Sequence, residues 1–206
     1  MSARCRIVVM AKAPLAGHAK TRLAPALGAA GAARLAARML AHAVEQAAAA
    51  GLGPVEICCT PDASHPAFAA LARCHAAVLS TQGEGDLGER MSCALERGLR
   101  EGPTLVIGTD APRLDADCLR RACDALADHD AVFVPALDGG YALVGLRAHA
   151  PELFRGIEWS TPRVMADTRL RLARLGLRHH ELPALADVDE PADLSHVPAH
   201  WLDDPA

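Results

Sequence analysis

Two observations predict an α/β fold in which a mostly parallel sheet carries helices on both faces. Short β-rich apolar runs alternate with helix-patterned segments along most of the 206 residues, as a parallel sheet requires. Apolar residues make up 51% of the chain, enough to fill one large core, so we expect a single domain over residues 1–206. Because ligands bind where the strands of such sheets end, the loops after strands are where chemistry is expected.

Local patterns place the individual elements in order along the chain. Prolines and glycines predict a long loop over residues 11–28, and alanine-rich helical spacing predicts a helix over residues 29–50. Ser160 or Thr161 is the expected N-cap of a later helix that begins at Pro162. The expected strands are residues 4–10, 55–60, 76–80, 104–108, 131–136, 141–146 and 178–182. The other expected helices are residues 66–73, the end of 84–100, 115–127, 162–175 and 191–195.

Composition and charge exclude several classes of protein. A net charge of -4 argues against a general nucleic-acid binder, and no apolar run reaches the roughly 20 residues that cross a bilayer. Residues 1–6 lead directly into a strand-like run, so we expect no signal peptide and a cytoplasmic protein. The seven cysteines form no C-x-x-C pair, and we expect reduced, mostly buried thiols.

The loop after the first strand carries an unusual concentration of positive charge. Lys12 and Lys20 are the only lysines in the chain, although Lys and Arg total 21, and both lie in K-A-P-L-A-G-H-A-K-T-R-L, residues 12–23. Gly17 lets the backbone approach a ligand closely, while Lys20 and Arg22 bring charge to phosphate oxygens. The Walker A pattern is absent. We interpret the segment as a phosphate-binding loop, with a solvated basic loop as the alternative.

Aspartates follow two of the predicted strands. A carboxylate at Asp110, after V-I-G-T, suits Mg²⁺ or Mn²⁺, which take oxygen ligands and bridge phosphates. Helix capping is the alternative for Asp110, although Asp115 is better placed for it. In the late A-D-V-D-E-P segment, Asp187 and Asp189 lie on one side if the chain is extended, so one of them completes the metal site. Capping of the next helix by Asp189 or Glu190 is the other interpretation.

Three further features are candidates for contacts with a substrate. Asp138, Gly139 and Gly140 form a D-G turn signal between two strands, and the glycines also clear space for a substrate. Trp159 either lines an acceptor pocket or packs in the core. The segment Q-G-E-G-D-L-G-E-R begins at Gln82. We interpret it either as a contact to a base edge or a ribose or as an ordinary flexible loop.

In this order the motifs resemble a known family, the GT-A-fold transferases called rSAM/selenodomain-associated transferase 1. More distantly, the chain is similar to 2-phospho-L-lactate guanylyltransferase and to molybdenum cofactor nucleotidyltransferases. The matching segments are M-A-K-A-P-L-A-G-H-A-K-T-R-L, Q-G-E-G-D-L-G-E-R-M, V-I-G-T-D-A-P, P-A-L-D-G-G-Y-A-L-V-G-L and D-V-D-E-P-A-D-L. The first of these departs from the superfamily's commoner G-G-x-G-x-R loop.

The resemblance implies a three-layer αβα sandwich, the nucleotide-diphospho-sugar transferase fold. In that superfamily the first loop clamps a triphosphate and the Q-x-x-G segment helps to hold the base. The matching residues here are Lys12, Lys20, Arg22, Gln82 and Gly85. The acid after the fourth strand is a metal ligand there, which implies Asp110 as a ligand here, with Asp189 as the second ligand and Asp187 as the alternative.

Three functions remain open at the level of sequence. The first is nucleotidyl transfer from an NTP to a small phosphorylated acceptor, with Lys20, Arg22 and Asp110 as catalytic residues. The second is glycosyl transfer from an NDP-sugar, with Asp138 as a base or sugar-orienting group. The third is a non-catalytic nucleotide-binding module. We expect a monomer or homodimer whose partners are a nucleotide and a small-molecule acceptor, without nucleic acid or membrane.

Overall fold

The computed structural model describes residues 4–202, and within that range seven strands form one sheet. The strand order is β3-β2-β1-β4-β6-β5-β7, and β6 alone runs antiparallel to its neighbours. The strands are β1 (Arg6–Lys12), β2 (Val55–Thr60), β3 (Val78–Thr81), β4 (Thr104–Ile107), β5 (Ala131–Pro135), β6 (Tyr141–Leu146) and β7 (His179–Glu181). The α-helices are α1 (Ala24–Ala50), α2 (Pro66–His75), α3 (Leu87–Leu99), α4 (Ala116–Ala125) and α5 (Val164–Leu175). Short 3-10 helices are η1 (Thr21–Leu23), η2 (Pro151–Leu153), η3 (Pro191–His196) and η4 (Ala199–Trp201).

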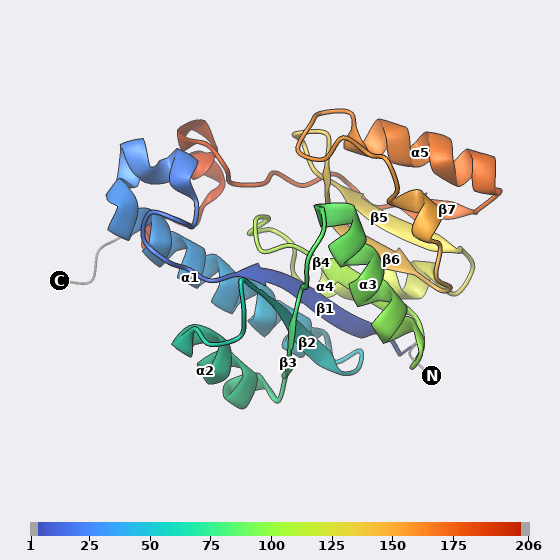
Figure 1. Ribbon diagram of the computed structural model, residues 1–206, viewed down its shortest axis with the longest axis horizontal. Helices are drawn as coiled ribbons and strands as arrows, with labels where there is room; N and C mark the ends of the chain where they lie inside the picture. The colour runs from blue at the N-terminus through green and yellow to red at the C-terminus, as the bar shows by residue number, and fades with distance from the viewer. Residues whose placement is uncertain (1–3, 203–206) are drawn as a thin grey trace.

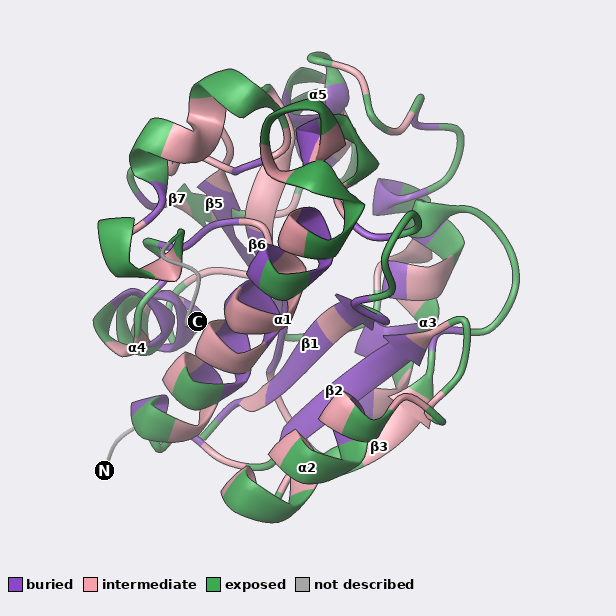
Figure 2. Ribbon diagram, turned by 90° about the vertical axis from the view of Figure 1, so that its left-hand side faces the viewer, coloured by how far each residue is buried: buried purple, intermediate pink, exposed green. Residues whose placement is uncertain are grey.

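Helices cover both faces of the sheet (Figure 1). Alternate residues of β1 point to opposite faces, so Ile7 and Val9 pack in the core with α1, α2 and α4, whereas Val8 packs in the core with α3 and α5. Figure 2 shows β1 and β2 largely buried between these layers. The predicted three-layer αβα sandwich with a mostly parallel sheet is therefore confirmed.

Some predicted boundaries shift by a few residues. The loop over residues 11–28 is shorter than predicted, because α1 already begins at Ala24 and is interrupted at Gly28, whose φ is 70°. The third strand begins at Val78, since Ala76 takes a left-handed conformation that ends α2. Helix α5 begins at Val164 rather than Pro162, and Arg163 is the N-cap without a side-chain hydrogen bond.

Among residues 4–202 no helix is long and apolar enough to span a bilayer.

The sheet topology determines where a ligand site lies. The chain runs outward from β1 to β2 and β3, then returns to place β4 on the other side of β1. Loops after β1 and β4 therefore diverge in opposite directions and leave a crevice between them, where ligands of open α/β sheets bind. Lys12 ends β1 and Asp110 follows β4, so both flank this crevice.

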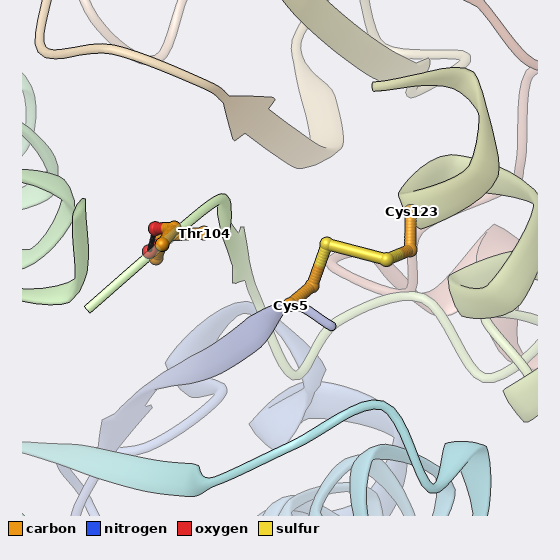
Figure 3. Close-up of a disulfide and its surroundings, with 4 residues drawn as sticks. Cys5, Thr104 and Cys123 are labelled. Atoms are coloured by element: carbon orange, nitrogen blue, oxygen red, sulfur yellow. Dashed lines mark hydrogen bonds between the residues drawn. A yellow bond between two sulfur atoms is a disulfide. The ribbon is translucent and has the colours of Figure 1, made fainter. Parts of the chain in front are cut away.

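The prediction that all cysteines are reduced is wrong for one pair. Cys5, just before β1, forms a disulfide with Cys123 of α4, and their Cα atoms are 6.2 Å apart (Figure 3). The two residues are 118 positions apart in sequence, so only the packing of α4 beside the start of β1 brings them together. Of the free cysteines, Cys58, Cys59 and Cys118 are buried, whereas Cys74 and Cys93 are exposed.

We expect the Cys5–Cys123 disulfide to stabilise the fold measurably. Because it closes a long loop in the unfolded chain, reduction should lower the free energy of unfolding by about 2–4 kcal/mol. Urea unfolding with and without a phosphine reductant measures the difference. The matched control is the Cys5→Ala/Cys123→Ala double variant, which should show the reduced stability in both conditions. Equal stability of the native chain with and without reductant would contradict the expectation.

Candidate functional site

A cavity of about 460 Å³ opens at the carboxyl edge of the sheet, in the crevice between β1 and β4. It is lined by residues from the loop after β1, from the ends of the central strands and from the start of α3. All the basic side chains on its wall come from the end of β1 and the loop that follows it, the β1 loop, and these residues are Lys12, His18, Lys20 and Arg22. The cavity therefore has one strongly basic side.

Lys20 is the electrostatic centre of the cavity. Its Nζ lies 2.5 Å from Oδ1 of Asp110 and 2.7 Å from Oδ1 of Asp189. Three segments that are distant in sequence thus meet at one point: the β1 loop, the β4 end and the segment after β7. The Lys20 side chain is 11% exposed, whereas the two carboxylates remain about half exposed and open to a ligand.

The backbone of the β1 loop is shaped to deliver Lys20 to this point. Lys20 has φ 48° and ψ 45°, a left-handed conformation that is unfavourable for a residue with a side chain. The next residues form η1, and Leu23 is fully buried in a cluster with Leu35 and Val188. The burial of Leu23 fixes the loop against the late segment, and the two ion pairs offset the cost of the Lys20 conformation.

The late D-V-D segment is tied to β4 through its backbone. The N–H of Val188 donates to the carbonyl of Asp110 at 2.9 Å, and the Val188 side chain is completely buried. With Val188 pointing inward, Asp189 meets Lys20. Glu190 is the N-cap of η3, in a capping box with Asp193. The segment therefore supplies a helix cap through Glu190 and a site carboxylate through Asp189. Figure 1 shows the β1 loop beside this C-terminal segment.

Burial and neighbouring charges together leave the pKa values of both Lys20 and Asp187 raised above their ordinary values. Burial of the Lys20 ammonium favours a lower pKa, but the charges of Asp110 and Asp189 outweigh it and raise the pKa above the ordinary lysine value. Lys20 therefore carries a full positive charge at neutral pH. Burial raises the pKa of Asp187, and the negative charge of Asp138 raises it further. The carboxylates on this side of the site therefore repel one another.

The remaining residues predicted to bind nucleotide fall into two groups. Lys12, Arg22 and Gln82 line the cavity. Gln82 is held in place because its Nε2 donates to the carbonyls of Cys58 (3.0 Å) and Ala11 (3.3 Å). Since both amide hydrogens serve carbonyl acceptors, the polar atom left for a ligand is the acceptor Oε1.

Gly17 and Gly85 do not line this cavity. Gly17 has φ 77° in the turn before Lys20, and a Cβ there would contact nothing within 4 Å. A Cβ at Gly85 would lie 2.3 Å from Oε2 of Glu89, whose carboxylate accepts from the N–H of Asp86 in the capping box of α3. Both glycines shape the backbone, and their contact with nucleotide stays a prediction.

A second cavity of about 240 Å³ shares a border with the first at Asp110, Asp189 and Tyr141. Asp138, Gly140 and Trp159 line it, as the sequence suggested for substrate contacts. Gly139 does not line it but supports its wall. The second cavity is thus adjacent to the point where Lys20 meets its two aspartates.

The wall of the second cavity is rigidly built from the β5–β6 turn and the segment before α5. The N–H of Gly140 donates to Oδ1 of Asp138 at 2.8 Å, which orients this carboxylate. The carbonyl of Gly139 accepts from the N–H of Met165 at 2.8 Å. A Cβ at Gly139 would lie 2.2 Å from the carbonyl oxygen of Pro162, so only glycine allows the two segments to pack. The D-G-G sequence is therefore both a hairpin turn and a cavity wall.

Sequence reasoning missed several residues of the site. Thr60 and Thr109 line the first cavity. Their positions at or just after the ends of buried strands are the sequence signal that could have identified them. Met91 lines both cavities from the first turns of α3, which no local pattern indicates. Ser160 lines the second cavity with φ 61°, a left-handed conformation in a residue with a side chain. Such strain concentrates at functional sites and is visible only in the structure.

The fold and the site together define a protein of the nucleotide-diphospho-sugar transferase fold with a basic cavity at the switch point of its sheet. The sequence of residues 40–161 matches the family described as "Uncharacterized protein conserved in bacteria (DUF2064)". The match covers more than half of the chain, and the chain belongs to this family. No curated protein matches the sequence significantly.

Solved structures support the same fold. A protein from Desulfovibrio desulfuricans G20, provisionally described as a nucleotide-diphospho-sugar transferase, is 29% identical with a TM-score of 0.83, over 91% of this chain and 83% of that chain. CMP:2-keto-3-deoxy-manno-octonic acid synthetase complexed with CTP is 14% identical with a TM-score of 0.56, over 95% and 97% of the two chains. The 4-diphosphocytidyl-2C-methyl-D-erythritol synthase of Anaerococcus prevotii DSM 20548 is 8% identical with a TM-score of 0.62, over 98% and 100%. The enzyme class that these neighbours support is a nucleotide-using transferase.

Close packing at Gly139 yields a stability prediction. We expect Gly139→Ala to destabilise the protein more than Gly17→Ala, since both glycines have positive φ but only Gly139 faces a backbone carbonyl. Gly17→Ala should cost about 1–2 kcal/mol from the left-handed conformation alone. Gly139→Ala should cost at least about twice as much, because the steric conflict adds to the same conformational term. Urea unfolding of both variants measures this, and equal losses would contradict the packing argument.

Proposed function

We propose that this protein is a metal-dependent nucleotidyltransferase that joins an NTP to a small phosphorylated acceptor and releases pyrophosphate. The observation that carries the proposal is the convergence of Lys20, Asp110 and Asp189 beside the basic loop, at the switch point of the sheet. On the motifs quoted above, we also infer that the chain falls in the rSAM/selenodomain-associated transferase 1 group. Its cytoplasmic location stays a prediction.

The distribution of charge supports a triphosphate in the first cavity. Lys12, Lys20 and Arg22 all line it, and phosphate oxygens are the ligands that such a cluster of cations stabilises. Arg22 has a 69% exposed side chain and pairs only loosely with Glu190, at 3.8 Å, so its guanidinium is free to turn toward a ligand. From this concentration of positive charge we infer a triphosphate rather than a diphosphate as the ligand.

The residues present fit a divalent metal that binds together with the nucleotide. Asp110 and Asp189 already point at a single cation, the ammonium of Lys20. Within residues 4–202 no group of three or more His, Cys, Asp or Glu side chains gathers as a complete metal cage. Mg²⁺ is commonly held by one or two carboxylates plus substrate phosphates, which matches this pair. Such a metal would neutralise charge on the phosphates.

The transfer requires positioning more than covalent chemistry from the protein. An oxygen of the acceptor phosphate forms a bond to the α-phosphorus of the NTP, the bond from the α-phosphorus to the bridging oxygen breaks, and pyrophosphate leaves with the electron pair. Lys20 and Arg22 stabilise the negative charge that accumulates on the leaving pyrophosphate. Asp110 lies on the border of the two cavities, where the acceptor meets the nucleotide.

Glycosyl transfer from an NDP-sugar is the second candidate. It is favoured by the 29% identical structure from Desulfovibrio desulfuricans, provisionally described as a nucleotide-diphospho-sugar transferase. A sugar would extend from the first cavity into the second, where Asp138 is an exposed carboxylate that orients a hydroxyl or accepts its proton.

A turnover panel separates these functions. The protein is incubated with each NTP or NDP-sugar, Mg²⁺ or Mn²⁺, and a pool of phosphorylated metabolites. We expect acceptor-dependent release of pyrophosphate, lost in Asp110→Asn. Release of free NDP without pyrophosphate would overturn nucleotidyl transfer in favour of glycosyl transfer. Nucleotide binding without either product would leave a non-catalytic binding module.

We expect Lys20→Ala to change nucleotide and metal binding in opposite directions. Nucleotide affinity should fall by about 1.5–3 kcal/mol, as for other charge-assisted hydrogen bonds. Mn²⁺ affinity without nucleotide should rise, because the variant removes the Lys20 ammonium that pairs with Asp110 and Asp189 and competes with the metal for them. Calorimetry measures the affinity for the nucleotide, and electron paramagnetic resonance measures the concentration of free Mn²⁺ and hence the affinity for the metal.

The matched control for this variant is Lys12→Ala. Lys12 lines the same cavity, but among the described residues it forms no ion pair with either aspartate. It should therefore weaken nucleotide binding and leave Mn²⁺ affinity without nucleotide unchanged. Unaltered nucleotide affinity in Lys20→Ala would refute the phosphate role of Lys20.

A further inference from the structure

A few buried polar atoms of the chain have no hydrogen-bond partner. Among residues 4–202 the unpaired side-chain atoms are Oη of Tyr141, Nε1 of Trp159, Nε of Arg6, Nε of Arg90 and Nε2 of His42. Of these, Tyr141 and Trp159 belong to the walls of the two cavities, whereas the other three residues line neither. Because native proteins pair nearly all their buried polar groups, each exception needs a physical explanation. Two unpaired donors thus lie where a substrate is proposed to bind.

Tyr141 lies at the border between the two cavities. It is the first residue of β6, and it lines both cavities, as Asp110 and Asp189 do. Its ring packs edge-on against Phe133, with centroids 5.3 Å apart, and against Trp159, at 6.4 Å. These contacts fix the ring and with it the hydroxyl. Burial raises the pKa of Tyr141, so the hydroxyl keeps its proton at neutral pH and is a hydrogen-bond donor.

Cations reach this border from the β1 loop. Lys20 pairs there with both aspartates. Arg22 lines the first cavity and also a third cavity of about 370 Å³, whose other walls include Asp138 and Asp187. The positive charge of this loop, together with the metal of the proposed function, therefore offsets the negative charge of the carboxylates. An anionic phosphate can be held at the border from this side.

The strands on the other side of the border supply few hydrogen-bond donors. Strand β4 separates β6 from β1 in the sheet, so Tyr141 lies away from the basic loop. The residues of the β4 and β6 ends that line the first cavity with a hydroxyl group are Thr109 and Tyr141. The Thr109 hydroxyl already donates to Oδ1 of Asp110, at 3.3 Å. The Tyr141 hydroxyl is therefore the side-chain donor on this side that is left for an acceptor such as a phosphate oxygen.

We propose that the Tyr141 hydroxyl is a substrate-binding group, which donates a hydrogen bond to an oxygen of the nucleotide phosphate at the border of the two cavities. The inference rests on the proposed function, because that function places the phosphate chain in the first cavity. Under nucleotidyl transfer the phosphate at the border is the α-phosphate, where the acceptor attacks. The hydroxyl orients this phosphate and keeps its own proton, so no covalent bond to Tyr141 forms or breaks.

The variant Tyr141→Phe removes the hydroxyl and keeps the ring. Because no described residue pairs with this hydroxyl, we expect the ligand-free variant to be as stable in urea as the native chain, or more stable. Its affinity for NTPs and for inorganic tripolyphosphate, each with Mg²⁺, should fall about tenfold, as for the loss of other hydrogen bonds to charged groups. Calorimetry measures both affinities.

The matched control is Thr104→Val, which also removes one buried hydroxyl. The Thr104 hydroxyl donates to the carbonyl of Gly102 at 3.1 Å, and Thr104 lines neither cavity. This variant should show the opposite pattern, with lower stability in urea and unchanged affinity for both kinds of probe. The comparison separates a hydroxyl that stabilises the fold from one that is kept for a ligand.

Tyr141 also provides a direct spectroscopic readout, because it is the only tyrosine in the chain. Protein labelled with tyrosine that carries ¹³C at Cζ, the carbon that bears the hydroxyl, gives a single carbon resonance in nuclear magnetic resonance. We expect this resonance to move when ATP, GTP, CTP, UTP or tripolyphosphate binds, relative to the same sample with Mg²⁺ alone.

Three results would overturn the inference. They are lower stability of ligand-free Tyr141→Phe, which would assign the hydroxyl a structural partner such as an ordered water, unchanged affinity of this variant, and a Cζ resonance that does not move when a probe binds. Tripolyphosphate separates the inference from the proposed function. Binding of tripolyphosphate through Tyr141 without binding of any NTP refutes the proposed function and keeps the phosphate contact. Equal NTP binding with and without the hydroxyl refutes the inference alone, and a protein that binds neither probe refutes both.

Discussion

The contact on which the rest of the site depends is the double ion pair of Lys20 with Asp110 and Asp189. Each partner comes from a different part of the chain, and each alone would leave an uncompensated charge in a partly buried crevice. Their meeting holds the β1 loop, the end of β4 and the segment after β7 in one arrangement. The same arrangement keeps the Lys20 ammonium and two carboxylates close to where phosphates and a metal are proposed to bind.

The two cavities differ in the side chains that they present. The first presents the basic β1 loop, and the second presents carboxylates, hydroxyls and two aromatic rings. The border between them is the point at which Lys20 meets its aspartates. Under the proposed function, the phosphates of the substrate would lie at this border, beside Lys20. Orientation of this kind is the main contribution that a protein makes to phosphoryl and nucleotidyl transfer.

Rigid packing supports this division on both sides. Leu23 and Val188 are fully buried in one small cluster, which locks the β1 loop to the late segment. On the other side, Gly139 packs against Pro162 too closely for any side chain, and this contact holds the Asp138 turn against the segment that carries Trp159. The left-handed Lys20 and Ser160 lie at the ends of these two packed regions. Strained residues persist where the surrounding structure fixes them, as it does here.

The sequence by itself determined the fold class, because alternating strand and helix patterns depend on local periodicity and turn chemistry. It also indicated Lys20, Asp110, Asp189 and Asp138, because carboxyl ends of parallel strands share one edge. Tertiary structure alone decided that Lys20 bridges both aspartates, that Cys5 pairs with Cys123, and that Trp159 faces the same cavity as Asp138. The physical reason is that these contacts join segments far apart in the chain, and their geometry depends on packing that no local pattern encodes.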